Sequence, residues 1–278
     1  MFSKFNLELS DEIYNIGDYD KAHYKRIGER KYKEFDSTMK EKLNTFIKDN
    51  GIIDGTAMRN EWFNQIKVDV FLSHSHRDIE EVQAFAGWLH VEFGLTAFID
   101  SSVWGYCDDL LNQIDKAYCK NDDENTYNYT MRNYSTSHVH MMLAVSLAKM
   151  IDSTECIMFL NTPNSINWQN ELMRLKTNNS YKTFSPWIYD ELAMTSMLRV
   201  NEPIRYGMLK HGDVVFEQAE LKIEYNVTEY IEQMTKLNLS DLQKWKENLE
   251  GNMGEKALDN LYLLKGLIKE DYDAMLFG

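Results

Sequence analysis

The chain has 278 residues, 44% of them hydrophobic, so it can bury the core of one large domain with additions or of two small domains. Asp and Glu outnumber Lys and Arg by 44 to 30, and the formal net charge of -14 argues against nucleic-acid partners, whose phosphates it repels. The N-terminus lacks a signal-peptide core, and no run approaches the roughly 20 apolar residues that cross a bilayer, so we expect a cytoplasmic protein without a membrane partner.

The first predicted element is a long helix over residues 20–49, where apolar side chains recur every three or four positions among charged ones. Residues 68–74 (VDVFLSH) then predict a buried strand, residues 79–93 a helix, and residues 95–100 (LTAFID) a second strand. We therefore assign residues 1–65 to a helical N-terminal extension.

The middle of the chain alternates between weak and strong patterns. Residues 101–137 are rich in Asp, Asn and Tyr and predict an elaborated loop, with helical character only at residues 110–117. Residues 139–151 predict a helix and residues 156–161 (CIMFLN) a third strand. A polar stretch over residues 165–184 predicts a second loop.

In the last part of the chain, residues 221–227 (LKIEYNV) alternate like a final strand, and residues 229–268 predict helices. We therefore divide the chain after the N-terminal extension into a central domain over residues 66–232 and a helical C-terminal extension over residues 233–278.

Strands that alternate with helices predict right-handed βαβ units, and therefore an α/β fold with a doubly wound parallel sheet covered on both faces. In such sheets ligands bind outside the carboxyl ends of the strands. Residues 73–78, 100–104 and 161–165 follow the three predicted strands, and we expect them to share one rim with the helix that begins at Ser185.

The stretch SPWIYDEL, residues 185–192, opens that helix. Ser185 is a good N-cap and Pro186 a good first helical residue, so Trp187 and Glu191 project from the same face of the first turns. A glutamate early in a helix is favoured by the helix dipole and is often only a solvated charge. Spacing alone therefore leaves two interpretations of Glu191 open, a functional carboxylate at the rim or a surface residue.

Three stretches, VDVFLSHSHRD, GLTAFID and above all SPWIYDEL, resemble the Toll/interleukin-1 receptor (TIR) domain family, whose conserved box has a Trp four residues before a Glu-Leu pair. The resemblance covers residues 66–232 and implies a flavodoxin-like, doubly wound sheet. Many members cleave NAD at the nicotinamide glycosidic bond with the glutamate of that box. The resemblance therefore implies an NAD-cleaving hydrolase with Glu191 as the catalytic residue, NAD as substrate and no cofactor.

The resemblance also implies which residues bind the nucleotide. The first strand and its loop match the family's first box through Phe71, Ser73 and Asp78, and Asp100 begins the loop that in relatives carries self-association and covers the site. Trp187 either stacks on a ring of the nucleotide or packs under the helix. The residues expected to line the pocket are Ser73, His74, Ser75, Arg77, Asp100, Ser101 and Trp187.

The chemistry fits a single carboxylate. Breaking the N-glycosidic bond passes through a ribosyl cation, which Glu191 would stabilise directly or through the ribose hydroxyls. Nicotinamide leaves without taking up a proton, so the general acid that O-glycosidases require is not needed. Arg77 either offsets the pyrophosphate charge or is a solvated surface residue.

Two features depart from the family's pattern. The loop after Asp100 is longer than in relatives and lacks a Pro-Gly tip, and residues 165–184 separate the third strand from the Trp-Glu box, where relatives have only a few residues. A rival box, NWQNEL, holds Trp168 and Glu171 at a spacing of three rather than four. We therefore expect Glu191, and not Glu171, to be the essential acid.

Histidine and cysteine spacing does not favour a metal site. The three cysteines are an odd number without a CxxC pair, which indicates neither a disulfide framework nor zinc. His138 and His140, two apart on a predicted helix, point about 200° away from each other and cannot chelate together. His74 and His76 could do so only in an extended segment.

Three functions of different classes follow. The first is an enzyme that converts NAD to ADP-ribose or to a cyclic or modified ADP-ribose signal, as in bacterial TIR proteins of antiphage (Thoeris-type) systems, whose product activates a separate effector. The second is a non-enzymatic TIR interaction module that recruits partners through its loops and does not require Glu191. The third is an enzyme like the nucleoside deoxyribosyltransferases, which acts on free nucleosides.

Overall fold

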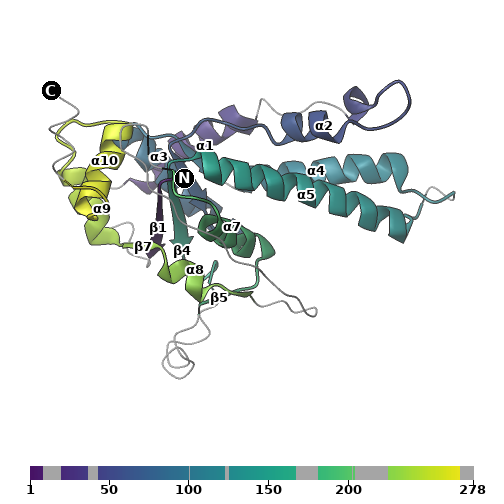
Figure 1. Cartoon of the computed structure of the whole chain (residues 1–278). Coiled ribbons are helices and arrows are strands. Elements are labelled where there is room, and N and C mark those ends of the chain that lie inside the picture. Colours follow the sequence, from purple (N-terminus) through teal and green to yellow (C-terminus); the bar gives the residue numbers. More distant parts are fainter. Residues whose placement is uncertain are drawn as a thin grey trace. The chain divides into compact units, whose positions relative to one another are not determined.

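Figure 1 shows the computed structural model of the chain, which describes residues 1–8, 20–36, 43–99, 101–122, 125–166, 181–201, 203 and 225–269. The chain divides into two compact units. Unit 1 consists of Met1–Arg30, Lys67–Ile99 and Ile151–Gly278, and unit 2 of Lys31–Ile66 and Asp100–Met150. Every strand of the central sheet belongs to unit 1.

The central sheet has five parallel strands in the spatial order β3-β2-β4-β1-β7 (Figure 1). These strands are β1 (Ser3–Glu8), β2 (Val70–Ser73), β3 (Ala97–Ile99), β4 (Cys156–Asn161) and β7 (Thr235–Leu237). β2 and β4 are buried at every residue, as expected for parallel strands covered on both faces. The predicted α/β class is confirmed, and the order of β3, β2 and β4 is consistent with a flavodoxin-like sheet.

The remaining elements are helices and two short strands. The helices are α1 (Lys21–Asp36), α2 (Gly55–Trp62), α3 (Ile79–Phe93), α4 (Ser101–Tyr118), α5 (Tyr129–Ser153), α7 (Pro186–Met197), α8 (Thr228–Glu232), α9 (Leu239–Glu247) and α10 (Glu255–Leu264), with the 3-10 helices η2 (Leu43–Phe46) and η3 (His76–Asp78). The short strands β5 (Lys182–Thr183) and β6 (Tyr225–Asn226) pair antiparallel.

Helices cover both faces of the sheet. On one face, α7 and α8 share a buried apolar cluster with Phe159 of β4. Side chains alternate along a strand, so Phe5 of β1, which is in register with the residue before Phe159, points to the other face. There Phe5 stacks on Tyr262 of α10, and Trp245 of α9 stacks on Phe93 of α3.

The N-terminal segment contributes a strand, which corrects the prediction of a purely helical extension over residues 1–65. β1 pairs with β4 on one side and with β7 on the other, so it lies inside the sheet. Its alternating sequence, SKFNLE, is only six residues long, and partners far along the chain decide its conformation. The helix predicted over residues 20–49 is confirmed only over Lys21–Asp36 (α1). Residues 37–42 lie outside the described ranges, and after them only the short 3-10 helix η2 is helical.

Helices α4 and α5 replace most of the loop predicted over residues 101–137. The buried residues of α4 recur every three or four positions from Cys107, which is the spacing of a helix packed on one side. Asp115 of α4 is buried and accepts hydrogen bonds from Arg132 Nε at 2.8 Å and from Ser135 Oγ at 2.6 Å. The polar residues that suggest a loop therefore include a buried aspartate that pairs with an exposed arginine of the next helix.

The C-terminal part differs from the prediction in two places. The strand predicted over residues 221–227 is, in its described part, only β6, which pairs with β5 rather than with the central sheet. β7 interrupts the segment predicted as helical over residues 229–268, and α9 then begins at a capping box formed by Asn238 and Asp241. The predicted strand over residues 156–161 is confirmed in full.

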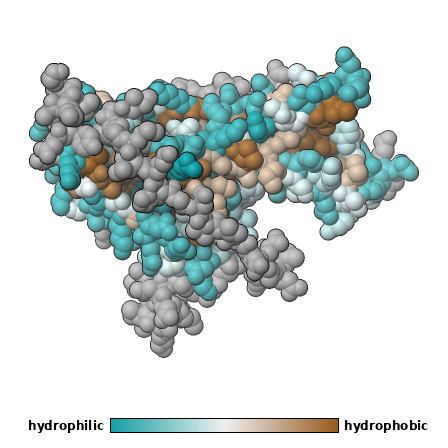
Figure 2. Space-filling model, in the orientation of Figure 1, coloured by the Kyte–Doolittle hydropathy of each residue, from teal (hydrophilic) through white to brown (hydrophobic). Residues whose placement is uncertain are grey.

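Large apolar side chains remain exposed in unit 2, among them Ile52, Tyr134 and Met141. Figure 2 shows hydrophobic residues on the visible face in separate patches among hydrophilic ones.

No helix within the described ranges is long and apolar enough to cross a membrane.

Two glycines allow α1 to approach α3 closely. A Cβ added at Gly28 would lie 1.8 Å from the backbone O of Gln83, and one added at Gly87 would lie 1.9 Å from the backbone O of Tyr24. Both distances are far below van der Waals contact, so any larger residue would force the two helices apart. The glycines therefore set the distance between α1 and α3.

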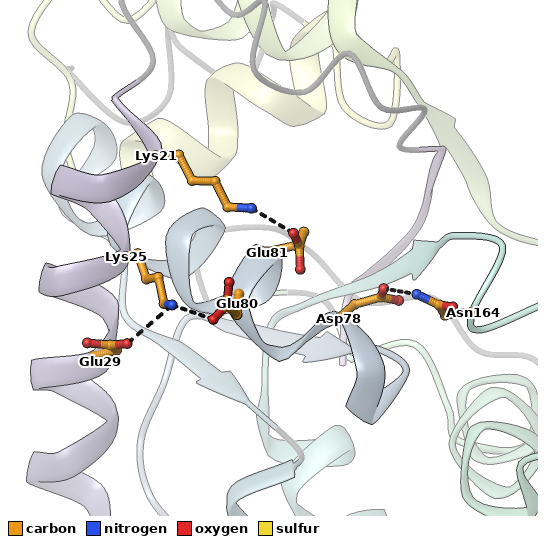
Figure 3. A network of polar contacts seen from close by, with 7 residues as sticks. All are labelled: Lys21, Lys25, Glu29, Asp78, Glu80, Glu81 and Asn164. Atoms are coloured by element: carbon orange, nitrogen blue, oxygen red, sulfur yellow. Dashed lines mark hydrogen bonds and ion pairs between the residues drawn. The ribbon is translucent and has the colours of Figure 1, made fainter.

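Ion pairs flank this helix contact. Lys21 pairs with Glu81 and Lys25 with Glu80, each at 2.7 Å (Figure 3). These side chains are partly exposed, and such pairs contribute only about 0–1 kcal/mol each. Close packing at the glycines is therefore the main determinant of this contact.

Gly28→Ala is expected to destabilise the protein, although alanine normally favours a helix by about 1 kcal/mol over glycine. The added methyl group meets a backbone carbonyl, so we expect the free energy of unfolding to fall by about 1–3 kcal/mol in urea titrations followed by tryptophan fluorescence. Gly55→Ala is the control, because its Cβ would meet only the flexible end of Met142 at 3.2 Å. Unchanged stability of the Gly28 variant would contradict the close contact.

Candidate active site

Helix α7 begins as its sequence predicts. Ser185 Oγ accepts a hydrogen bond from the backbone N–H of Ile188 at 3.2 Å, and Pro186 is the first helical residue. Ile188 and Leu192 are buried in the cluster that includes Phe159 of β4. The apolar positions of α7 therefore fix this helix on one face of the sheet.

Glu191 of α7 is buried, with 1% of its surface exposed, and contacts the end of β2. Its Oε2 accepts a hydrogen bond from Ser73 Oγ at 2.6 Å across 118 positions of sequence. Near the other end of α7, the carbonyl O of Thr195 accepts a hydrogen bond from Lys4 Nζ at 3.2 Å, close to the start of β1. α7 therefore runs antiparallel to the strands and holds Glu191 near their carboxyl ends, not in solvent.

A second buried carboxylate joins the turns that follow β2 and β4. Asp78 accepts hydrogen bonds from Thr162 Oγ1 and from Asn164 Nδ2, each at 2.5 Å (Figure 3 shows the contact with Asn164). Thr162 in turn donates its backbone N–H to Ser165 Oγ at 2.9 Å. The sequence stretch TPNS therefore forms a rigid turn anchored on an acid 84 positions earlier.

The same turn holds the start of α7. The carbonyl O of Ser165 accepts a hydrogen bond from Thr183 Oγ1 at 2.9 Å, and that hydroxyl accepts one from the backbone N–H of Ser185 at 3.2 Å. Hydrogen bonds thus run without interruption from Asp78 to the N-cap of α7. Sequence patterns give little sign of this network, because its members are ordinary turn residues.

The fold places the Ser73–Glu191 pair where a doubly wound sheet binds ligands. The chain leaves β2 for β3 on one side and returns to β4 on the other, so the strand order reverses between β2 and β4. In sheets of this class the ligand crevice lies outside the carboxyl ends at such a reversal. Ser73 is the last residue of β2, so Glu191 lies at that position.

The structure brings some of the predicted nucleotide-binding residues to this end of β2. His74 is buried next to Ser73, with Nδ1 3.3 Å from the carbonyl O of Leu72. Ser75 is half-buried and caps η3, where its Oγ accepts the backbone N–H of Arg77 at 3.4 Å. The side chain of Arg77 is exposed, as either interpretation of this residue allows.

The other predicted residues are less well tied to the site. Trp187 is half-buried on α7, one turn before Glu191. Ser101 is the first residue of α4 and belongs to unit 2. The residues that lie outside the described ranges are Asp100, Trp168 and Glu171, the last two being those of the rival box.

Asp190, which precedes Glu191 on α7, is an acid with a raised pKa that the sequence does not indicate. Burial raises the pKa of its carboxyl to about 6, and its Oδ2 has no hydrogen-bond partner within the described part of the chain. A carboxylate without a partner in a partly buried position favours its protonated form. Asp190 therefore changes charge close to neutral pH, unlike an ordinary surface aspartate.

Metal ligation has no support in the part of the chain that the structure describes, where no three His, Cys, Asp or Glu residues are placed to hold an ion. The three cysteines are buried thiols, and burial raises the pKa of Cys107 and Cys156 to about 12. A cavity of about 440 Å³ lies near the amino ends of β1 and β7, lined by Lys4 and Thr235 among others. That edge is opposite the one that carries Glu191.

Asp190→Asn is expected to stabilise the protein at neutral pH. Above pH 6 the folded chain carries a buried charge that costs free energy, whereas the unfolded chain carries the same charge in water. As the pH falls through 6, folded Asp190 binds a proton, and the penalty disappears near the ordinary pKa of 3.8. Urea titrations should therefore show a gain in free energy of unfolding at neutral pH that vanishes near pH 4. A gain independent of pH would contradict this explanation.

Comparisons of the chain with models of protein families, with curated proteins and with solved structures found no match. The function is therefore argued from the residues and the geometry of this site.

Proposed function

We propose that the protein cleaves NAD at the bond between nicotinamide and ribose, with Glu191 as the catalytic residue. The observation that carries the proposal is the buried Ser73–Glu191 hydrogen bond at the carboxyl end of β2. A carboxylate so far from water, placed at the ligand-binding edge of a doubly wound sheet, is typical of a functional group rather than of a solvated charge. The TIR-like spacing of Trp187 and Glu191 supports the same function.

Cleavage of the nicotinamide–ribose bond requires little beyond a negative charge held next to the ribose. The bond between ribose C1′ and the pyridinium nitrogen breaks, and its electron pair passes to the ring, so nicotinamide departs neutral. Positive charge develops on the ribose, and a carboxylate shielded from water stabilises it more strongly than one in bulk solvent. Water then adds to C1′ and releases a proton to give ADP-ribose, or a nucleophile within the ADP-ribosyl group adds to give a cyclic product.

Ser73 contributes by positioning. Its hydroxyl donates to one carboxylate oxygen of Glu191 at 2.6 Å, which restricts the orientation of the acid. The hydrogen bonds from Asp78 to Ser185 restrict the helix that carries it. Such preorganisation is the main way in which a single charged group accelerates a reaction.

The charges of the substrate also suit this end of β2. NAD carries a pyrophosphate, and an acidic protein needs a local cation to accept it. Arg77 follows Ser73 by four residues and has an exposed side chain that can meet a phosphate. The positively charged pyridinium would then face Glu191.

A signalling role extends the proposal. An ADP-ribose-derived product would act on a separate effector, as in the antiphage TIR proteins, and self-association through the segment that begins with α4 would regulate its formation.

Glu191→Gln is expected to abolish NAD cleavage, by at least about 100-fold in kcat/KM, because the amide keeps the shape of the side chain but not its charge. Ser73→Ala is expected to lower kcat by about tenfold, since the acid remains but loses its positioning hydrogen bond. Chromatographic measurement of released nicotinamide and of the ADP-ribosyl product tests both.

Glu232→Gln serves as the matched control, because Glu232 is exposed on α8 in the same unit and should leave turnover unchanged. Nicotinamide release by Glu191→Gln at the native rate would contradict the assignment, and so would a native protein that leaves NAD intact.

A further inference from the structure

Asn161, the last residue of β4, is buried, and its side chain has no hydrogen-bond partner in the described part of the chain. Its side chain is 2% exposed, and neither Nδ2 nor Oδ1 is bonded to any described residue. A buried primary amide loses its hydrogen bonds to water and gains nothing in exchange, which costs free energy. Buried polar side chains are nearly always bonded, so this exception requires an explanation.

Strand geometry places Asn161 on the face of the sheet that α7 covers. Phe159 of β4 lies in the cluster with Leu192 of α7, and Asn161 follows it by two residues, so both side chains point to the same face. Ser73 is in register with Phe159 and donates to Glu191 on that face. Asn161 is therefore one side-chain repeat, roughly 6–7 Å, closer to the carboxyl edge than the level of Ser73.

β1 adds a second polar group on this face. Asn6 is in register with Phe159, and Glu8 with Asn161. Asn6 is fully buried, and its Nδ2 donates to Glu8 Oε1 at 3.4 Å, while its Oδ1 has no partner in the described ranges. Lys4, two residues earlier on the same face, donates to the backbone of α7, which confirms that this face lies under the helix. The neighbouring strands β1 and β4 thus each carry a buried amide side chain on this face, and within the described ranges each amide has atoms without a hydrogen-bond partner.

The position of Asn161 is also that of the ligand crevice. The strand order reverses between β2 and β4. Ser73 is the last residue of β2, and Asn161 is the last residue of β4. A ligand that contacts Glu191 above β2 would therefore extend over the end of β4. Its own polar groups would supply the partners that the amide lacks.

We propose that Asn161 recognises the carboxamide group of the nicotinamide moiety. This inference rests on the proposed function and names the part of the substrate that the site selects. A primary carboxamide has one acceptor and an N–H donor side by side, which match the Nδ2 donor and the Oδ1 acceptor of Asn161 in a paired hydrogen bond. The unsatisfied Oδ1 of Asn6 is a further acceptor for the second N–H of the carboxamide.

The proposal predicts discrimination between NAD and nicotinic acid adenine dinucleotide, in which a carboxylate replaces the carboxamide. The carboxylate has no N–H to donate, so it would leave Asn161 Oδ1 unpaired and place a second negative charge near Glu191. We expect the native protein to favour NAD by at least about tenfold in kcat/KM, and Asn161→Leu to reduce that preference to within about threefold. Asn248→Leu is the control, because Asn248 is exposed after α9 in the same unit and should leave the preference unchanged.

Binding measurements separate this inference from the proposed function. Calorimetric titration of both dinucleotides into Glu191→Gln, with and without Asn161→Leu, reports the preference without turnover. Preference for NAD that disappears with Asn161→Leu supports the inference even if the native protein does not cleave NAD, in which case only the proposed function fails. An unchanged preference in Asn161→Leu, or no binding of NAD at all, would overturn the inference.

Stability provides a second readout of the same proposal. Asn161→Leu removes a buried amide that has no partner among the described residues, so its urea midpoint should equal or exceed that of the native protein. A clearly lower midpoint would show that the amide serves the fold, and would overturn its assignment to the ligand.

Discussion

The hydrogen bond between Ser73 and Glu191 is the contact on which the site depends, because it is the point at which a buried acid on α7 meets the sheet. A buried carboxylate is stable only where donors replace the water that it loses. The strand end supplies one such donor, and the hydrogen bonds from Asp78 through Thr162, Ser165 and Thr183 hold the start of α7 where that donor can be reached. The contacts that fix the position of α7 therefore also fix the position of Glu191.

The N-terminal strand links this site to a part of the chain that sequence patterns separate from it. β1 lies between β4 and β7, where it extends the sheet beyond the strands of residues 66–232. It brings Asn6 and Glu8 onto the face under α7, in register with Phe159 and Asn161. The residues 1–30 are thus part of the same compact unit as the candidate site, and removal of this segment would remove one wall of it.

Elements whose conformation depends on neighbouring residues could be predicted from the sequence, whereas strands that depend on distant partners could not. The strand over residues 156–161 and the cap at Ser185 follow from runs of neighbouring residues, and both are confirmed. β1 and β7 are short, and their partners lie far along the chain, so their own sequences carry too little information. Glu191 could be singled out by its spacing from Trp187. That the Asn161 side chain lacks hydrogen-bond partners in the described ranges depends on which groups surround it in three dimensions, so the sequence could not show it.

The buried groups near Glu191 suggest how an acidic protein can take a dinucleotide. Asn6, Ser73 and Asn161 are neutral and hydrogen-bonding, so in the proposed site they would select a ligand by shape and donor pattern rather than by net charge. The two carboxyl groups that follow each other on α7 differ in environment, since Glu191 has a hydroxyl donor whereas burial raises the pKa of Asp190 to about 6. In the two proposals, recognition of the ring by neutral amides and stabilisation of the sugar by a carboxylate fall to different side chains, so each can be altered without the other.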